Sequence, residues 1–249
     1  MKQNGRLIIL TGPSCVGKSP LKQALIKLYP ELWQSLQPLV FYCSRAPRPS
    51  EVDGVDYHFR SREQIKELEQ NKDFAVLEVR GDLQALDLKE LASWLAQGDV
   101  FFEGNPFVGR LLQTHAQFAN IEKLGIFMSP LGREEIVFLQ SPERNVSLPE
   151  LLTDIMRRKL LRRTRRQKGE LSLPDLENIE TRAASAYQEM HFAHHFEYVI
   201  VNHDGEDSDN WESFYCPLGD ARKSLKAFVL LLKGESPPGI EHWPTTLLA

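Results

Sequence analysis

The sequence has few cysteines, no long apolar run and little net charge. Its three cysteines, Cys15, Cys43 and Cys216, lie far apart and match neither a disulfide framework nor the spacing of a zinc site. A reducing cytoplasm is therefore the expected location. The apolar runs LIIL, after MKQNGR, and AFVLLL, near the C-terminus, are too short for a signal-peptide core and for a membrane span respectively. We expect no membrane association.

The remaining composition bounds the class of protein without naming a partner. The formal net charge of -4 over 249 residues predicts no overall attraction to nucleic acid or to anionic membranes. No sequence repeat of fixed period is present, which argues against a solenoid. With 42% hydrophobic residues, the chain can bury a sizeable core, and we expect one main domain.

Short apolar runs alternate with segments of helical periodicity along most of the chain. Helical patterns such as REQIKELEQ and LDLKELASWLAQG separate most of these runs, as crossover helices between parallel strands would. The predicted fold class is therefore α/β. The expected strands cover residues 6–10, 39–43, 74–79, 99–104, 124–129 and 196–201.

Residues 12–19 read GPSCVGKS, the spacing of a phosphate-binding loop between a strand and a helix. Backbone N–H groups of such a loop point at phosphate oxygens, and the helix N-terminus adds a favourable dipole. Lys18 is expected to reach the terminal phosphates and Ser19 to bind Mg²⁺. Pro20 is compatible with a first helical turn, whereas Cys15 restricts the loop if its position needs positive φ. The predicted phosphate-binding residues are Gly12, Pro13, Ser14, Cys15, Val16, Gly17, Lys18 and Ser19.

A second motif, CSRAPRPSEVDGVDYHF, spans residues 43–59. Its prolines and glycine exclude a regular helix, so Arg45, Arg48, Glu51 and Tyr57 are expected to converge on a ligand. Arginine forks suit phosphate, a carboxylate can read a base edge that carries donors, and a phenol can add a hydrogen bond to phosphate. The alternative is an ordinary hairpin with exposed charges.

Together the two motifs resemble the guanylate kinase family, whose nucleotide monophosphate site carries a run similar to SRAPRPSEVDGVDYHF. Later segments agree, namely IFMSPLGREEI, IETRAASAYQEM and FEYVIVN, so the resemblance covers about residues 6–203. It implies a P-loop NTPase-type parallel sheet with an inserted NMP-binding subdomain at about 37–98 and a helical lid at about 140–173. The core would comprise residues 1–36, 99–139 and 174–233. Residues 234–249 lie outside it and are expected to form a loosely attached tail.

The resemblance also implies ATP as the phosphate donor, GMP as the acceptor and Mg²⁺ as the cofactor. It places Arg45 and Arg48 on the GMP phosphate, with Ser44 and Tyr57 also at the acceptor and Glu51 close to the nucleotide. It further implies that Arg162 or Arg163 is the lid arginine. Two more positions follow from it, Arg182 as a second arginine at the transferred phosphoryl group and Asn202 near the adenine.

Three positions depart from the family's pattern. In FAVLEVRGDLQALD the expected tyrosines are missing, and Glu78 is the candidate for the base-reading glutamate. In FFEGNPF, Glu103 and Asn105 stand where two aspartates are usual, so Glu103 is assigned to the metal with Ser19 and Asn105 to the acceptor base. Phe41 stands where the family has a hydroxyl.

Two clusters of basic residues and histidines admit several interpretations. RRKLLRRTRRQK, residues 157–168, has eight basic residues in twelve. It is interpreted as an enlarged lid, as a patch that binds RNA or an acidic protein surface, or as a solvated helix face. Nucleic acid is the less favoured partner. His191 and His195 have a spacing that metal sites use, but near a helix C-terminus histidines also interact well with the helix dipole.

The sequence thus predicts an ATP:GMP phosphotransferase acting as a monomer or homodimer. Because the base-reading region is altered, two alternatives stay open. One is a kinase for another phosphorylated small molecule. The other is a catalytically impaired guanylate-kinase-like module that binds a nucleotide or a protein.

Overall fold

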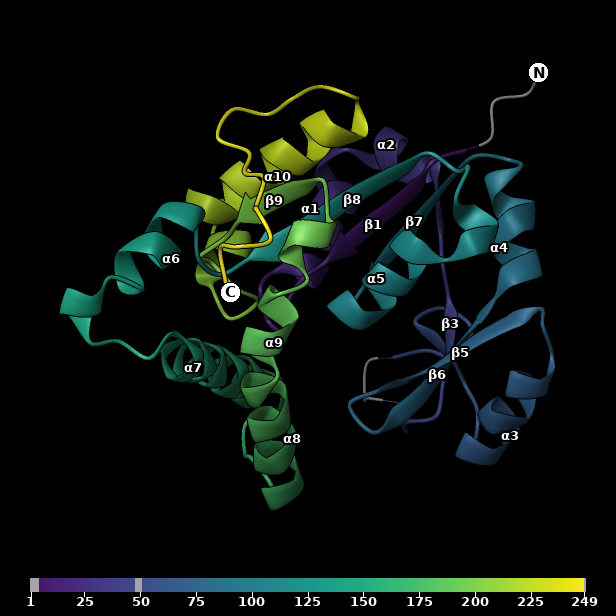
Figure 1. The fold of residues 1–249 in the computed structure, drawn as a ribbon, viewed down its shortest axis with the longest axis horizontal. Coiled ribbons are helices and arrows are strands. Elements are labelled where there is room, and N and C mark those ends of the chain that lie inside the picture. The colour runs from purple at the N-terminus through teal and green to yellow at the C-terminus, as the bar shows by residue number, and fades with distance from the viewer. Residues whose placement is uncertain (1–4, 48–50, 249) are drawn as a thin grey trace.

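The computed structural model describes residues 5–47 and 51–248 of the chain. Five parallel strands form a central sheet in the order β2-β7-β1-β8-β9 (Figure 1). The predicted α/β class is confirmed, and the strands expected at 74–79 and 99–104 have those bounds. The sheet strands are β1 (Leu7–Thr11), β2 (Leu36–Pro38), β7 (Asp99–Gly104), β8 (Lys123–Ser129) and β9 (Tyr198–Val201).

Strand β1 is buried on both faces, because side chains along a strand alternate between the two layers of helices. Ile8 and Leu10 belong to the core beneath α1 (Lys18–Leu28) and α10 (Gly219–Leu232). Leu7 and Ile9 belong to the core beneath α4 (Leu88–Leu95) and α5 (Pro106–Thr114). None of the helices within the described ranges is long and apolar enough to cross a membrane.

A second sheet, with the strand order β4-β3-β6-β5, lies beside the first (Figure 1). Its strands are β3 (Phe41–Cys43), β4 (Tyr57–Phe59), β5 (Phe74–Val79) and β6 (Asp82–Asp87), and α3 (Arg62–Glu67) covers one face. Arg80 and Gly81 join β5 to β6 with φ values of 53° and 88°, as a two-residue type I′ turn requires. Neither β6 nor this hairpin was predicted from the sequence.

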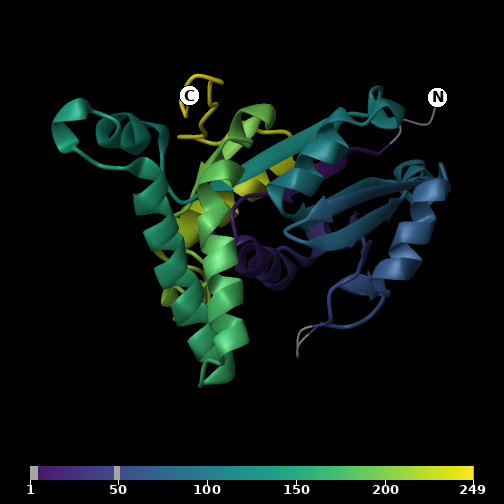
Figure 2. The ribbon, with the colours of Figure 1, turned by 60° about the horizontal axis from the view of Figure 1, so that its bottom comes forward.

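Two long antiparallel helices, α7 (Leu148–Lys168) and α8 (Leu173–Ala184), lie side by side (Figure 2). Gly169, with a φ of 77°, ends α7, and Ser172 caps α8 in a capping box with Asp175. The lid boundary expected at residue 173 therefore falls inside a helical hairpin. The hairpin continues to residue 184, where α9 (Ala186–Met190) follows.

The C-terminal segment is packed against the domain, so the expectation of a loosely attached tail is wrong. Trp243, Leu247 and Leu248 are buried in the main core cluster. Glu241 forms a bridge with Val199 of the edge strand β9. The sequence did not predict this packing, because three prolines interrupt the hydrophobic periodicity of the segment. They do not prevent the burial of its side chains.

Candidate active site

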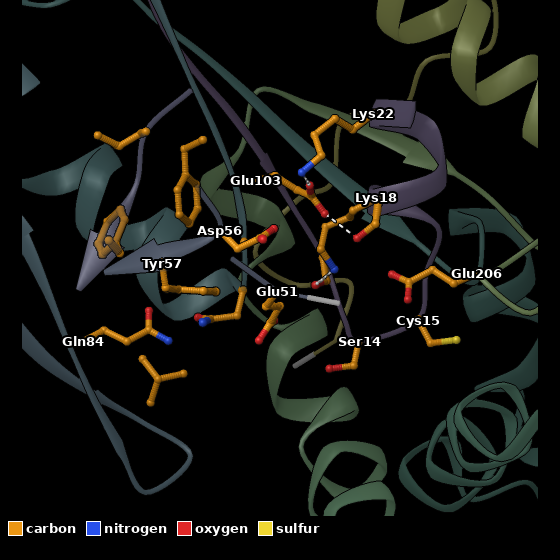
Figure 3. Close-up of a pocket in the computed structure, with 18 of the residues that line it drawn as sticks. Ser14, Cys15, Lys18, Lys22, Glu51, Asp56, Tyr57, Gln84, Glu103 and Glu206 are labelled. Carbon is orange, nitrogen blue, oxygen red and sulfur yellow. Dashed lines mark hydrogen bonds and ion pairs between the residues drawn. The ribbon is translucent and has the colours of Figure 1, made fainter. Parts of the chain in front are cut away.

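A cavity of about 610 Å³ opens where the carboxyl ends of β1 and β7 face the second sheet and the helical hairpin. Parallel sheets commonly bind ligands at this edge. The cavity walls come from the β1–α1 loop, the second sheet and the helical hairpin, which lie far apart in the sequence. Figure 3 shows Lys18 of the loop and Tyr57 of the second sheet on facing walls. The predicted residues that line it are Gly12, Ser14, Cys15, Lys18, Ser19, Arg45, Glu51, Tyr57, Glu103, Asn105, Arg163 and Arg182.

The loop between β1 and α1 has the left-handed conformations that its glycines predict. Gly12 and Gly17 have φ values of 147° and 110°. A Cβ atom at Gly12 would lie 2.3 Å from the carbonyl oxygen of Met128, and one at Gly17 would lie 2.4 Å from Nδ2 of Asn202. Cys15 also has positive φ, 67°, so this position has the conformation in which a glycine would be unstrained.

Lys18 lies inside the loop. Its side chain is buried, and Nζ donates to the carbonyl oxygens of Gly12 and Pro13, both at 2.8 Å. Burial lowers the pKa of Lys18, although the nearby carboxylates of Glu206 and Glu103 act in the opposite direction. The ammonium group is therefore held at the centre of the loop, where phosphate oxygens would meet it.

Ser19 and Glu103, the predicted metal pair, are in contact. Ser19 Oγ donates to Glu103 Oε1 at 2.8 Å, and Lys22 Nζ forms an ion pair with Oε2 at 2.8 Å. Lys22 was not among the predicted site residues, although it lies one helical turn after Lys18 on the same face of α1. Hydroxyl and carboxylate oxygens are ligands that Mg²⁺ accepts, and it commonly uses one or two protein ligands together with phosphates.

The histidines offer no comparable metal site. Nδ1 of His191 is 2.9 Å from the carbonyl oxygen of Tyr187, and the His194 and His195 rings are tilted by 43° with centroids 3.9 Å apart. No group of three or more metal-ligating His, Cys, Asp or Glu side chains is found among residues 5–47 and 51–248. Ser19 and Glu103 stay the predicted metal pair.

The acceptor side of the cavity is built on β3 and β4. Arg45 forms a bidentate ion pair with Glu51, with both N···O distances at 2.6 Å, and its guanidinium carbon lies 5.0 Å from the centroid of the Tyr57 ring. Ser44 does not line the cavity, because its Oγ accepts from the backbone N–H of Leu83 at 2.8 Å. The Ser44 side chain thus links β3 to β6 by a hydrogen bond. Arg48 lies outside the described residues.

Glu78 does not reach the cavity, so its assignment as the base-reading glutamate is wrong. Its register partner on β6 is Leu83, which packs against α3, and residues opposite each other in a ladder share a face. The Glu78 side chain is 59% exposed and pairs with Arg62 at 3.4 Å. The next residue along each strand, Val79 on β5 and Gln84 on β6, points to the other face and lines the cavity.

Asn105 does line the cavity, and it also begins a helix. Its Oδ1 accepts from the N–H of Val108 at 3.1 Å, as an N-cap residue does at the start of α5. One end of this amide is therefore committed to the fold.

The helical hairpin contributes two arginines. Arg163 and Arg182 line the cavity, whereas Arg162 is 65% exposed and pairs with Asp207 at 2.7 Å outside it. Of the two candidates for the lid arginine, Arg163 is therefore the one that faces the site. Arg163 pairs with Glu206 at 2.7 Å, and Nε of Arg182 donates to Ser14 Oγ at 3.1 Å.

The segment after β9 supports the phosphate-binding loop from below. Asn202 is fully buried, and its Nδ2 donates to the carbonyl oxygen of Val16 at 2.7 Å. The Asn202 side chain has no exposed surface that could contact a base. The prediction that it lies beside adenine is therefore wrong, and it lies beneath the phosphate-binding loop. The N–H of Glu206 donates to the carbonyl oxygen of Cys15 at 3.0 Å. Burial raises the pKa of Glu206, but Arg163 and Lys18 outweigh it and the pKa is lowered.

Most of the basic stretch 157–168 is paired with acidic side chains. Lys159, Arg162, Arg163 and Arg166 reach acidic residues of the segment after β9, and Arg157 reaches Glu180 of α8. These pairs join α7 to α8 and to the segment after β9.

Comparisons with known proteins agree with this architecture. The sequence model of the guanylate kinase family matches residues 4–82. A guanylate kinase of Idiomarina loihiensis is 32% identical over 82% of this chain and 82% of its own length. One from Shewanella denitrificans is 30% identical over 84% of each chain. The crystal structure of guanylate kinase from Anaplasma phagocytophilum matches with a TM-score of 0.54 at 17% identity, covering 94% of this chain and 87% of that one.

The last comparison supports the fold, and the sequence relatives extend over most of both chains. The family model extends over the phosphate-binding loop and over β3, β4 and β5 of the second sheet. This chain belongs to the guanylate kinase family.

Proposed function

We propose that this protein transfers the γ-phosphate of ATP to GMP. The observation that carries the proposal is the single cavity that joins a phosphate-binding loop, the Arg45 and Tyr57 wall and the arginines of the helical hairpin. A donor phosphate at Lys18 and an acceptor phosphate at Arg45 would face each other across this space. Membership of the guanylate kinase family supports GMP as the acceptor.

Phosphoryl transfer depends mainly on positioning and on positive charge around the transferred group. Lys18 and the backbone N–H groups of the loop bind the donor phosphates, and Arg45 binds the acceptor phosphate. Arg163 and Arg182 direct positive charge into the same space from the helical hairpin. Since Arg163 and Arg45 are paired with carboxylates in this structure, an arriving phosphate would exchange places with Glu206 or Glu51.

Ser19 and Glu103 would hold Mg²⁺, which in such reactions neutralises charge on the donor phosphates. Lys22, paired with one oxygen of Glu103, would keep the other oxygen directed at Ser19. Cys15, Cys43 and Cys216 are unpaired thiols, which agrees with a reducing compartment such as the cytoplasm.

The proposal is tested by coupled ADP release with MgATP and GMP, AMP, CMP or UMP. We expect release that depends on GMP, and Lys18→Met should lower kcat by about a thousandfold because the donor phosphates lose their buried cation. Lys72→Met, at an exposed lysine, is the matched control and should keep wild-type activity.

Two other results would redirect the proposal. Turnover with an acceptor other than GMP would indicate a kinase for a different phosphorylated molecule. Calorimetric binding of ATP or GMP without turnover would indicate a nucleotide-binding module.

A further inference from the structure

The carboxylate of Glu206 lies among the positive charges on the donor side of the cavity. Glu206 lines the cavity and belongs to the connection between β9 and α10. Its Oε2 accepts from Nη1 of Arg163 at 2.7 Å, and the side chains of Arg163 and Glu206 are only 14% and 13% exposed. Burial raises its pKa, but Arg163, Lys18 and Arg182 outweigh this effect and the pKa is lowered. Glu206 is thus an anion of the protein at the point where these three cations converge.

The backbone fixes the position of this carboxylate. The N–H of Glu206 donates to the carbonyl oxygen of Cys15 at 3.0 Å. A Cβ atom at Gly205 would lie 2.6 Å from the same oxygen, so glycine allows the connection to approach the phosphate-binding loop this closely. Nε1 of Trp211 donates to the carbonyl oxygen of Gly205 at 3.0 Å. Figure 3 shows Glu206 beside Cys15, with its carboxylate directed toward Lys18.

A carboxylate and a phosphate bind the same cations. Both are oxyanions that accept charge-assisted hydrogen bonds from arginine and lysine. Glu206 accepts from Nη1 of Arg163, whereas Nε of Arg163 is buried and has no hydrogen-bond partner in the described part of the chain. A phosphate group, which has more oxygens than a carboxylate, can therefore satisfy a donor that Glu206 leaves unpaired.

We infer that Glu206 competes with the donor phosphates for Arg163 and Lys18, so that ATP binds by displacing this carboxylate. In taking the loop that carries Lys18 as the donor site, the inference rests on the proposed function. The competition lowers the affinity for ATP. In exchange, the carboxylate reduces the repulsion among the cations and keeps Arg163 directed at the cavity before the donor binds.

The test compares Glu206→Gln with the wild-type protein. This substitution keeps the length of the side chain and removes its charge. Calorimetry, without any acceptor, measures the binding of ATP and of tripolyphosphate, which has the phosphates but no nucleoside. We expect Glu206→Gln to bind both about tenfold more tightly, because a hydrogen bond between charged groups has roughly this effect on an equilibrium.

Asp209→Asn is the matched control. It makes the same change in net charge on the same connection, but Asp209 pairs with Arg166 at the surface and its side chain is 79% exposed. It should bind both ligands as the wild type does. Equal tightening in Asp209→Asn would mean that net charge alone is responsible, and this would overturn the inference. Unchanged or weaker binding in Glu206→Gln would also overturn it, because Glu206 would then only support the loop.

A second measurement needs no variant. In a crystal structure of the wild-type protein with tripolyphosphate, Arg163 should contact the phosphates and no longer Glu206. An Arg163–Glu206 pair that stays at 2.7 Å beside bound tripolyphosphate would overturn the inference. Circular dichroism and urea midpoints establish that the two variants are folded.

The same proteins separate this inference from the proposed function. If the wild type shows GMP-dependent ADP release but Glu206→Gln binds tripolyphosphate no more tightly, only the inference fails. If Glu206→Gln binds tripolyphosphate more tightly but the wild type releases no ADP with any acceptor, the proposed transfer fails and the competition at the donor site stands.

Discussion

At the scale of single residues, Cys15 is the clearest conflict between side chain and backbone. Its φ of 67° is one that only glycine adopts without strain, yet its side chain is fully buried beneath the phosphate-binding loop. Burial raises the pKa of this thiol to about 12, so it stays protonated at neutral pH. The cysteine therefore acts through packing and conformation.

Substitutions at Cys15 separate the conformational cost from the loss of the sulfur. Cys15→Gly and Cys15→Ala both remove Sγ, but only glycine removes the Cβ atom that the positive φ disfavours. We expect Cys15→Gly to be more stable than Cys15→Ala by about 1 kcal/mol. Urea denaturation measures the free energy of unfolding, and an alanine variant as stable as the glycine variant would contradict this reading of the loop.

At the scale of elements, residues 202–218 between β9 and α10 form an unusually long connection, since such connections commonly have about 2–6 residues. Glu206 and Asp207 from this connection pair with Arg163 and Arg162 of α7, and the N–H of Glu206 bonds to the phosphate-binding loop. The connection therefore ties the helical hairpin to the loop. The acidic residues of this connection and the basic residues of α7 therefore form one network of ion pairs.

The same connection contains a histidine that makes this region sensitive to pH. His203 Nδ1 is 2.6 Å from Asp220 of α10, and Nε2 is 2.9 Å from Glu135 of α6 (Arg133–Leu139). Partial burial lowers the pKa of His203, but the two carboxylates outweigh it, so the pKa is raised above 6.5. The folded state thus holds a proton that the unfolded state releases at lower pH.

It follows that the contribution of His203 to stability is fully present below the unfolded pKa and is lost as pH rises through the raised folded pKa. Comparing wild type with His203→Gln in urea, we expect a larger stability advantage for wild type at about pH 6 than at about pH 9. Lys223, which pairs with Asp220, stays charged over most of this range. An advantage independent of pH would show that the charged pairing contributes nothing.

At the scale of the whole molecule, one ion pair joins the second sheet to the helices beyond the cavity. Arg80, in the turn between β5 and β6, bonds to Glu189 of α9, whose carboxylate is fully buried and also accepts from Ser185 Oγ. It joins the turn between β5 and β6 to α9.

A double-mutant cycle measures this connection. Arg80→Asn keeps a residue that tolerates positive φ but leaves the buried Glu189 without its cation, so we expect a loss of about 2 kcal/mol. Combined with Glu189→Gln, the loss should be smaller than the sum of the single losses by about 1 kcal/mol or more. Arg166→Asn, which breaks the exposed pair with Asp209, is the control and should cost under about 1 kcal/mol. Strict additivity would mean that the two segments are held together by other contacts.

The sequence by itself determined the features that depend on local pattern. Apolar runs and glycine spacing predicted β1, the loop and α1, because phosphate binding by backbone N–H groups needs one particular order of strand, glycines and helix. The cluster around Arg45 and Tyr57 was predicted in the same way. Local chemistry therefore identified the charged residues Lys18, Arg45 and Glu103 of the cavity.

Tertiary structure decided the features that depend on which way a side chain faces and what packs against it. The β5–β6 register turns Glu78 outward and Gln84 inward, and a register cannot be read from one strand alone. Burial moved Asn202 beneath the loop, and distant acidic residues neutralised the basic stretch of α7. The C-terminal segment packs on the core because Trp243 and two leucines find an apolar surface there. Such contacts join residues far apart in the chain, so only the folded chain specifies them.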